Sequence, residues 1–153
     1  GDTETGVTIM RVTAGWDSGP IYLAAKEPIH PDDDYGTLAP RLEMLGAQLL
    51  VQALDEHPTP VEQEESLVTY AHKIGSRERA LDPTQPPQEV ERTVRALRPH
   101  IGARLPLPDG SFPGVVGAQV DGPTRAAARR TASLTPAVFD HGAGLALTIG
   151  GLP

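Results

Sequence analysis

Residues 5–20 read TGVTIMRVTAGWDSGP, and this stretch decides how the first part of the chain folds. Residues 7–12 follow Gly6 and are rich in β-branched residues, which is typical of a strand and predicts one over this range. The second half carries glycines and a proline, which favour a loop over residues 14–20. A second short strand is expected over residues 21–24. Asp17 then lies in a glycine-flanked loop directly after a strand, where α/β sheets often place residues that contact ligands.

A long amphipathic helix is expected over residues 34–55. Its apolar residues are spaced by four, three and four positions, which places them on one helical face: Leu38, Leu42, Leu45 and Leu49. Residues 32–34 are three aspartates just before or at the first turn, where carboxylates cap free amides and oppose the positive end of the helix dipole. Adjacent carboxylates do not converge on one ion, so we expect no metal site there.

The second half of the chain has a different texture. Residues 57–66 are acidic and contain prolines, which is typical of a linker. A second helix is expected with Pro86 and Pro87 at its start, Val90, Val94 and Leu97 on one face and a stop at Arg98-Pro99. From Ala103 onward, short apolar runs alternate with turn signals, which predicts a small β-rich domain.

Composition narrows the class of protein. The chain has 153 residues and no cysteine, so disulfides and thiolate metal sites are excluded. No apolar run approaches the roughly 20 residues that span a bilayer, so no membrane association is expected. The net charge of -7 is divided unevenly, because residues 1–65 carry -10 and residues 66–153 carry +3. A mildly cationic half, in which nine of ten basic residues are arginine, indicates either an anionic partner or an ordinary solvated surface.

Three segments carry a resemblance to a known family. Residues 1–20 are similar to the pattern G-x-x-x-T-G-V-T-[IL]-M followed by G-[LWV]-D-[ST]-G, the second half of the signature of folate-dependent formyltransferases. Residues 69–74, TYAHKI, resemble the T-Y-A-x-K-[IL] segment of methionyl-tRNA formyltransferases, and residues 96–103, ALRPHIGA, resemble a segment at the entry to their C-terminal barrel. Together these segments span most of residues 1–118.

The resemblance implies an α/β fold followed by a β fold. Residues 1–56 would form the C-terminal part of a Rossmann-like catalytic domain, residues 57–75 a linker, and residues 76–153 an incomplete OB-like barrel that binds tRNA. The implied reaction is formyl transfer from 10-formyltetrahydrofolate to the amino group of initiator methionyl-tRNA. The family's Asn-x-His and S-L-L-P motifs are not in the chain, so we expect an internal fragment, inactive alone, of a cytoplasmic enzyme that is monomeric at full length.

The expected site residues follow from the same resemblance. Asp17 is the expected catalytic residue, because formyl transfer to an amine passes through a tetrahedral intermediate and needs a group that moves protons or tunes an imidazole. The expected cofactor-binding residues are Val12, Ala14, Gly15, Trp16 and Gly19. The expected tRNA-binding residues are Lys73, Arg92, Arg95, Arg98 and Arg104. No metal ligands are expected, since the five histidines share no ligand spacing.

Other interpretations stay open at this point. Asp17 could be a turn-forming aspartate that bonds its own backbone, and the arginines three apart could be a solvated helix face. The chain could derive from another formyltransferase of the same fold, acting on a nucleotide-sugar amine or a purine precursor. Residues 66–153 could also be a non-catalytic RNA-binding module, although they offer few aromatic stacking platforms: Tyr70, Phe112 and Phe139.

Overall fold

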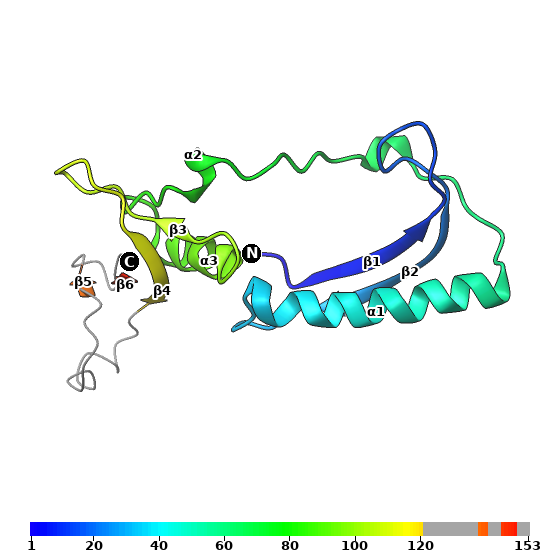
Figure 1. The fold of residues 1–153 in the computed structure, drawn as a ribbon, viewed down its shortest axis with the longest axis horizontal. Coiled ribbons are helices and arrows are strands. Elements are labelled where there is room, and N and C mark those ends of the chain that lie inside the picture. Colours follow the sequence, from blue (N-terminus) through cyan, green and yellow to red (C-terminus); the bar gives the residue numbers. More distant parts are fainter. Residues whose placement is uncertain (121–137, 141–144, 150–153) are drawn as a thin grey trace. The chain divides into compact units, whose positions relative to one another are not determined.

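A computed structural model of the chain describes residues 1–120, 138–140 and 145–149 (Figure 1). Its residues gather into two compact units. The first comprises Gly1–Asp33 and Thr37–His72, and the second comprises Asp34–Gly36 and the described residues from Lys73 onward. Each unit has its own sheet and its own helix packing, so the two are described separately.

The first unit is built on an antiparallel strand pair, β1 (Glu4–Met10) and β2 (Ile21–Pro28). Glu4 pairs with Pro28 at one end and Met10 with Ile21 at the other, with a register irregularity between Ile9 and Met10. Both strands are therefore longer than, or offset from, the expected ranges 7–12 and 21–24. From Leu23 to Pro28 the residues of β2 alternate between half-buried and exposed, which is typical of a strand whose two faces have different surroundings.

Helix α1 (Tyr35–Glu56) confirms the expected long helix. Figure 1 shows it running along the β1–β2 pair, and a side chain at Gly46 would meet a methyl group of Val7 at 3.4 Å. Leu49, from the predicted apolar face, is buried. Pro40 lies inside the helix, where it removes one backbone donor. After α1 the chain returns to the sheet, and a single antiparallel bridge joins Val61 to Ile21 before the short 3-10 turn η1 (Glu65–Leu67).

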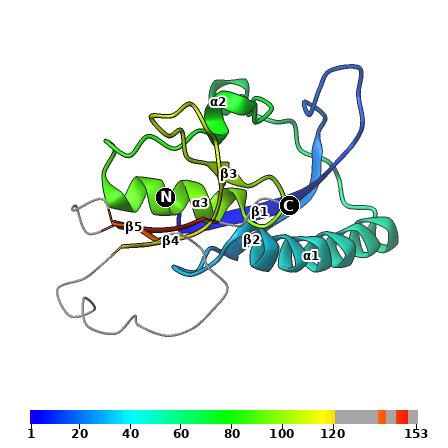
Figure 2. The same cartoon turned by 60° about the vertical axis from the view of Figure 1, so that its left-hand side comes forward.

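The second unit pairs helices with a four-stranded antiparallel sheet. The elements are α2 (Ser76–Arg79), α3 (Pro87–Leu97), β3 (Ala103–Arg104), β4 (Gly114–Val120), β5 (Val138–Asp140) and β6 (Leu145–Ile149). The strand order is β3-β4-β6-β5. Helix α3 packs on the sheet, as Figure 2 shows from a second direction.

The core of the second unit forms between α3 and the sheet. Val90, Val94 and Leu97, the predicted apolar face of α3, are all buried there. They pack with four residues from the loops and strands: Leu81, Ala103, Leu105 and Val115. The hydrophobic stripe of α3 thus packs against one face of the sheet, which is the usual way in which an amphipathic helix is stabilised.

No helix among the described residues is long and apolar enough to span a bilayer.

Candidate functional site

The loop between β1 and β2 is closed at its base by the backbone. The amide of Arg11 donates to the carbonyl of Pro20 at 2.9 Å. Arg11 directly follows β1 and Pro20 directly precedes β2, so this hydrogen bond joins the two ends of the loop. Gly19 lies directly against this closure, because a Cβ built on it would stand 1.7 Å from the Arg11 carbonyl oxygen. Only glycine fits this close approach of two backbone segments.

Asp17 lies in this closed loop with a φ of 49°, in the left-handed region. Non-glycine residues are uncommon in that region, and aspartate and asparagine are the ones that tolerate it best. The hydroxyl of Ser18, the next residue, lies 3.5 Å from the hydroxyl of Thr13 across the loop. Asp17 is exposed, so its carboxylate is accessible to a substrate.

A hollow of about 270 Å³ is formed by residues 10–19, except Ser18. Its lining includes all six residues of the expected catalytic and cofactor-binding set: Val12, Ala14, Gly15, Trp16, Asp17 and Gly19. Val12 is 88% exposed and Trp16 is 94% exposed, so both offer open apolar surface beside the carboxylate. The hollow is slightly smaller than ordinary ligand pockets, which have volumes of roughly 300–1,000 Å³.

The loop also has a contact that the sequence did not predict. The side-chain amide of Gln63 reaches it from the segment after the Val61 bridge, and lies within hydrogen-bonding distance of the carbonyls of Asp17 and Gly19. A single glutamine in an acidic, proline-containing segment has no periodicity or motif that would reveal this contact. Only the bridge between Val61 and Ile21, which depends on the fold, could have done so.

The five expected tRNA-binding residues all lie in the second unit, and three of them are ion-paired. Arg92 contacts Glu89 at 2.7 Å, Arg95 contacts Glu91 at 2.8 Å, and Arg98 contacts Asp34 at 3.1 Å. Arg104 donates to the carbonyl of Phe112 at 3.2 Å. Lys73 lies in the exposed segment before α2. These contacts do not use all the hydrogen-bond donors of the arginines, because each guanidinium has five N–H donors.

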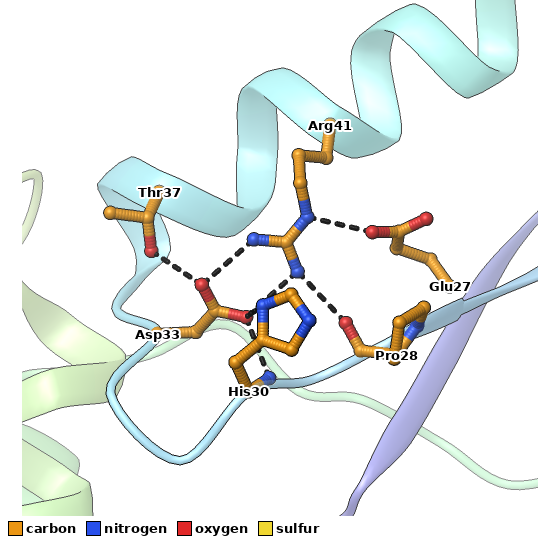
Figure 3. A network of polar contacts seen from close by, with 6 residues as sticks. All are labelled: Glu27, Pro28, His30, Asp33, Thr37 and Arg41. Atoms are coloured by element: carbon orange, nitrogen blue, oxygen red, sulfur yellow. Dashed lines mark hydrogen bonds and ion pairs between the residues drawn. The ribbon is translucent and has the colours of Figure 1, made fainter.

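A polar network at the other end of β2 fixes the start of α1 (Figure 3). The carboxylate of Asp33 is buried and accepts hydrogen bonds from both terminal nitrogens of Arg41, at 2.8 and 2.7 Å. It also accepts from the His30 amide at 2.7 Å and the Thr37 hydroxyl at 2.9 Å. Arg41 in turn bonds Glu27 at 2.6 Å. Asp33 therefore does more than oppose a helix dipole, because it joins the end of β2 to α1.

This network makes Asp33 a source of pH-dependent stability. The hydrogen bonds from Arg41, and then those from His30 and Thr37, hold the pKa of the Asp33 carboxyl well below its ordinary value of 3.8. Because the folded-state pKa is depressed, the stabilisation is complete above that ordinary value and is lost as pH falls through the folded-state pKa. Asp33→Asn should therefore lower the urea midpoint at neutral pH, and its deficit relative to wild type should shrink on acidification below about pH 4.

Urea titrations of wild type and variant at several pH values measure that difference. The matched control is Asp32→Asn, on the exposed neighbouring residue. A deficit for Asp33→Asn that is constant from neutral to acidic pH would contradict the assignment of the stabilisation to the ionised carboxylate.

Among the residues that the structure describes, no three His, Asp or Glu side chains gather in a way that could hold a metal ion.

Comparisons with known proteins match the part of the chain that forms the strand pair, its loop and nearly all of the long helix. Residues 1–54 match the family model described as formyl transferase, which covers the loop with Asp17 and nearly all of α1. The chain is 45% identical over 103 residues to a methionyl-tRNA formyltransferase of Stutzerimonas stutzeri, covering 65% of the chain and 33% of that relative. It is 34% identical over 166 aligned positions to the methionyl-tRNA formyltransferase of Pseudomonas putida, covering 97% of the chain and 54% of the relative.

These matches confirm the resemblance to methionyl-tRNA formyltransferases that the sequence indicated. The chain spans about a third to a half of the length of these curated relatives, 33% and 54% respectively.

Solved structures agree on the fold. A methionyl-tRNA formyltransferase from Clostridium thermocellum has a TM-score of 0.60 at 14% identity, over 78% of this chain and 52% of that one. HypX from Aquifex aeolicus in complex with tetrahydrofolic acid has a TM-score of 0.65 at 18% identity, over 79% of this chain and 22% of that one. At these identities the likeness concerns the fold alone, and it supports the Rossmann-like α/β part of the expected architecture.

Proposed function

We propose that this chain supplies the catalytic aspartate for formyl transfer from 10-formyltetrahydrofolate to the amino group of methionyl-tRNA. The observation that carries the proposal is the loop of residues 11–20, in which Asp17 is exposed beside an open hollow. The family match over residues 1–54 and the curated relatives of 34% and 45% identity support it. As a translation enzyme, the protein that contains this chain would act in the cytoplasm, and we expect it to be monomeric.

The residues of the loop suit one face of a folate ring. Val12 and Trp16 expose apolar surface, and the exposed Gly15 has no side chain to keep a flat ring from the backbone, whereas the buried Gly19 closes the loop against Arg11. When bound, 10-formyltetrahydrofolate supplies the formyl group that the amine accepts. Asp17 lies where a carboxylate can hold a proton-carrying water or favour the charged form of a neighbouring imidazole, both of which assist a tetrahedral intermediate. The oxyanion donor and the imidazole would come from residues outside this chain.

We assign residues 1–56 to the catalytic domain, residues 57–75 to a linker, and residues 76–153 to an OB-like domain that binds tRNA. The sheet β3-β4-β6-β5 and the helix packed on it are compatible with a small β-rich domain. In this proposal Lys73, Arg92, Arg95, Arg98 and Arg104 contact phosphates.

The experiment that tests the reaction uses a protein of the curated relatives' length that contains this chain. Formyl transfer from 10-formyltetrahydrofolate is measured with methionyl-tRNA, with an amino sugar nucleotide and with glycinamide ribonucleotide as alternative acceptors. Formylation of methionyl-tRNA at a kcat/KM far above that of the other acceptors is expected. A preference for the sugar or the purine precursor would overturn the choice of acceptor and leave the formyl transfer itself in place.

Phosphate binding by α3 should appear in the salt dependence of tRNA affinity. Each neutralised phosphate contributes a slope of about -0.7 to -0.9 to log affinity against log salt. Arg95→Gln with Arg98→Gln should therefore make the slope less steep by that amount for each phosphate that the variant no longer neutralises. Neutralisation is preferable to charge reversal, because Glu91 and Asp34 lie beside these arginines.

The control for this titration is Lys26→Gln, which removes one exposed cation from β2, outside the proposed tRNA-binding domain. Binding is measured with tRNA at several salt concentrations. Equal slopes for wild type and the double variant would show that Arg95 and Arg98, at the end of α3, form only a solvated surface. The further basic residues Arg125, Arg129 and Arg130 lie outside the described residues and would be the next set to substitute.

A further inference from the structure

Gln63 holds both carbonyls that flank Ser18 in the loop of Asp17. Its Nε2 atom lies 2.9 Å from the carbonyl oxygen of Asp17 and 2.7 Å from that of Gly19. Both are good hydrogen-bond distances. A glutamine amide has two N–H donors, so both are used on this loop. The same atom lies 3.8 Å from the sulfur of Met10, and the side chain is half-buried.

The position of Gln63 is fixed by the sheet and not by the loop. Val61 and Ile21 exchange two backbone hydrogen bonds, of 2.7 and 2.8 Å, which attach the returning chain to the start of β2. Gln63 follows two residues later and reaches across to the loop. The loop's own connections are the backbone bond from Arg11 to Pro20 at its base and the long contact between the Thr13 and Ser18 hydroxyls.

The geometry also fixes the orientation of the amide. Two carbonyl oxygens face the same terminal atom of Gln63, so this atom must be the nitrogen, because an oxygen there would oppose two other acceptors. The contact therefore depends on a donor and not merely on side-chain bulk. Glutamate has the same shape as glutamine but, when ionised, has no donor at all.

We propose that Gln63 is a positioning residue for Asp17: by binding the carbonyls of Asp17 and Gly19, it keeps Asp17 in its left-handed conformation and aims its carboxylate at the hollow. This inference rests on the proposed function, because it assigns Gln63 a role through Asp17. A misplacement of about 1 Å at a catalytic group can lower the rate by roughly 100-fold. The loss of two hydrogen bonds to such a loop should therefore reduce turnover markedly without removing a group that touches substrate.

The test uses a full-length protein that contains this chain. Gln63→Glu keeps the side-chain shape and removes the donors, and Gln63→Ala removes the side chain beyond Cβ. Gln48→Glu is the matched control, since Gln48 is exposed on α1 and its substitution makes the same change of charge. We expect kcat to fall by about ten-fold or more in both Gln63 variants, with KM for methionyl-tRNA within about two-fold of wild type. Gln48→Glu should retain wild-type kcat. Equal kcat values for Gln63→Glu and Gln48→Glu would overturn the inference.

A double-mutant cycle with Asp17→Asn separates a positioning role from general stabilisation. If Gln63 acts through Asp17, adding Gln63→Ala to Asp17→Asn should cost little further activity, because coupled residues are not additive. Full additivity would mean that Gln63 only supports the fold, which would overturn the inference. Retained activity in Asp17→Asn itself would instead overturn the proposed role of the aspartate, so the two failures are distinguishable.

Discussion

Asp17→Asn is expected to lower kcat for formyl transfer by about 100- to 10,000-fold in a full-length protein that contains this chain, the usual range for losing a group that assists proton transfer. Asparagine keeps the size of the side chain and removes its charge. It also tolerates the left-handed backbone, with a φ of 49°, almost as well as aspartate does. The loop should therefore keep its shape while it loses the carboxylate.

The choice of asparagine matters for the interpretation. Asp17→Ala would add backbone strain, because alanine is unfavourable in the left-handed region, and a loss of activity could then come from a distorted loop. The matched control is Asp55→Asn, an exposed aspartate near the end of α1. Steady-state kinetics should show a loss in kcat with an unchanged thermal unfolding midpoint. Turnover within about three-fold of wild type would remove Asp17 from the mechanism and favour the interpretation that it only forms a turn.

The parts of the fold that the sequence predicted are those with a periodic or local signal. The spacing of Val90, Val94 and Leu97 predicted the face that α3 buries, since a stripe at helical spacing needs only one surface to cover. The loop around Asp17 was predicted from its glycines and from the family pattern. Its expected cofactor-binding residues come together because they are close in sequence.

The parts that the sequence did not predict depend on partners that are distant along the chain. The end of β2 reads as polar, but Glu27 lies opposite Thr5 in the sheet and bonds Arg41 from α1, so its charge is compensated in the strand. Asp33 is one of three consecutive aspartates that look alike in sequence, and only the approach of Arg41 distinguishes the buried one. Gln63 is likewise identified only by the bridge between Val61 and Ile21.

Gly19→Ala is expected to lower formyl-transfer activity by roughly 100-fold, because it displaces the loop that carries Asp17. A Cβ at this position would stand 1.7 Å from the Arg11 carbonyl oxygen and 2.9 Å from its carbonyl carbon. These are backbone atoms, so no side-chain rotation relieves the clash. The loop must open at its base, and the neighbouring hydrogen bonds from Arg11 to Pro20 and from Gln63 to the Gly19 carbonyl must lengthen or break.

Gly114→Ala is the matched control, since Gly114 lies in β4 and has no atom within 4 Å of an added Cβ. Activity and tRNA affinity are measured for both variants. Gly19→Ala should lose turnover while tRNA binding remains near wild type, because the substituted position lies outside the proposed tRNA-binding domain. Gly114→Ala should change neither quantity. Wild-type turnover in Gly19→Ala would show that the loop tolerates opening, and the rigid placement of Asp17, on which the roles of both Gln63 and Gly19 depend, would then be wrong.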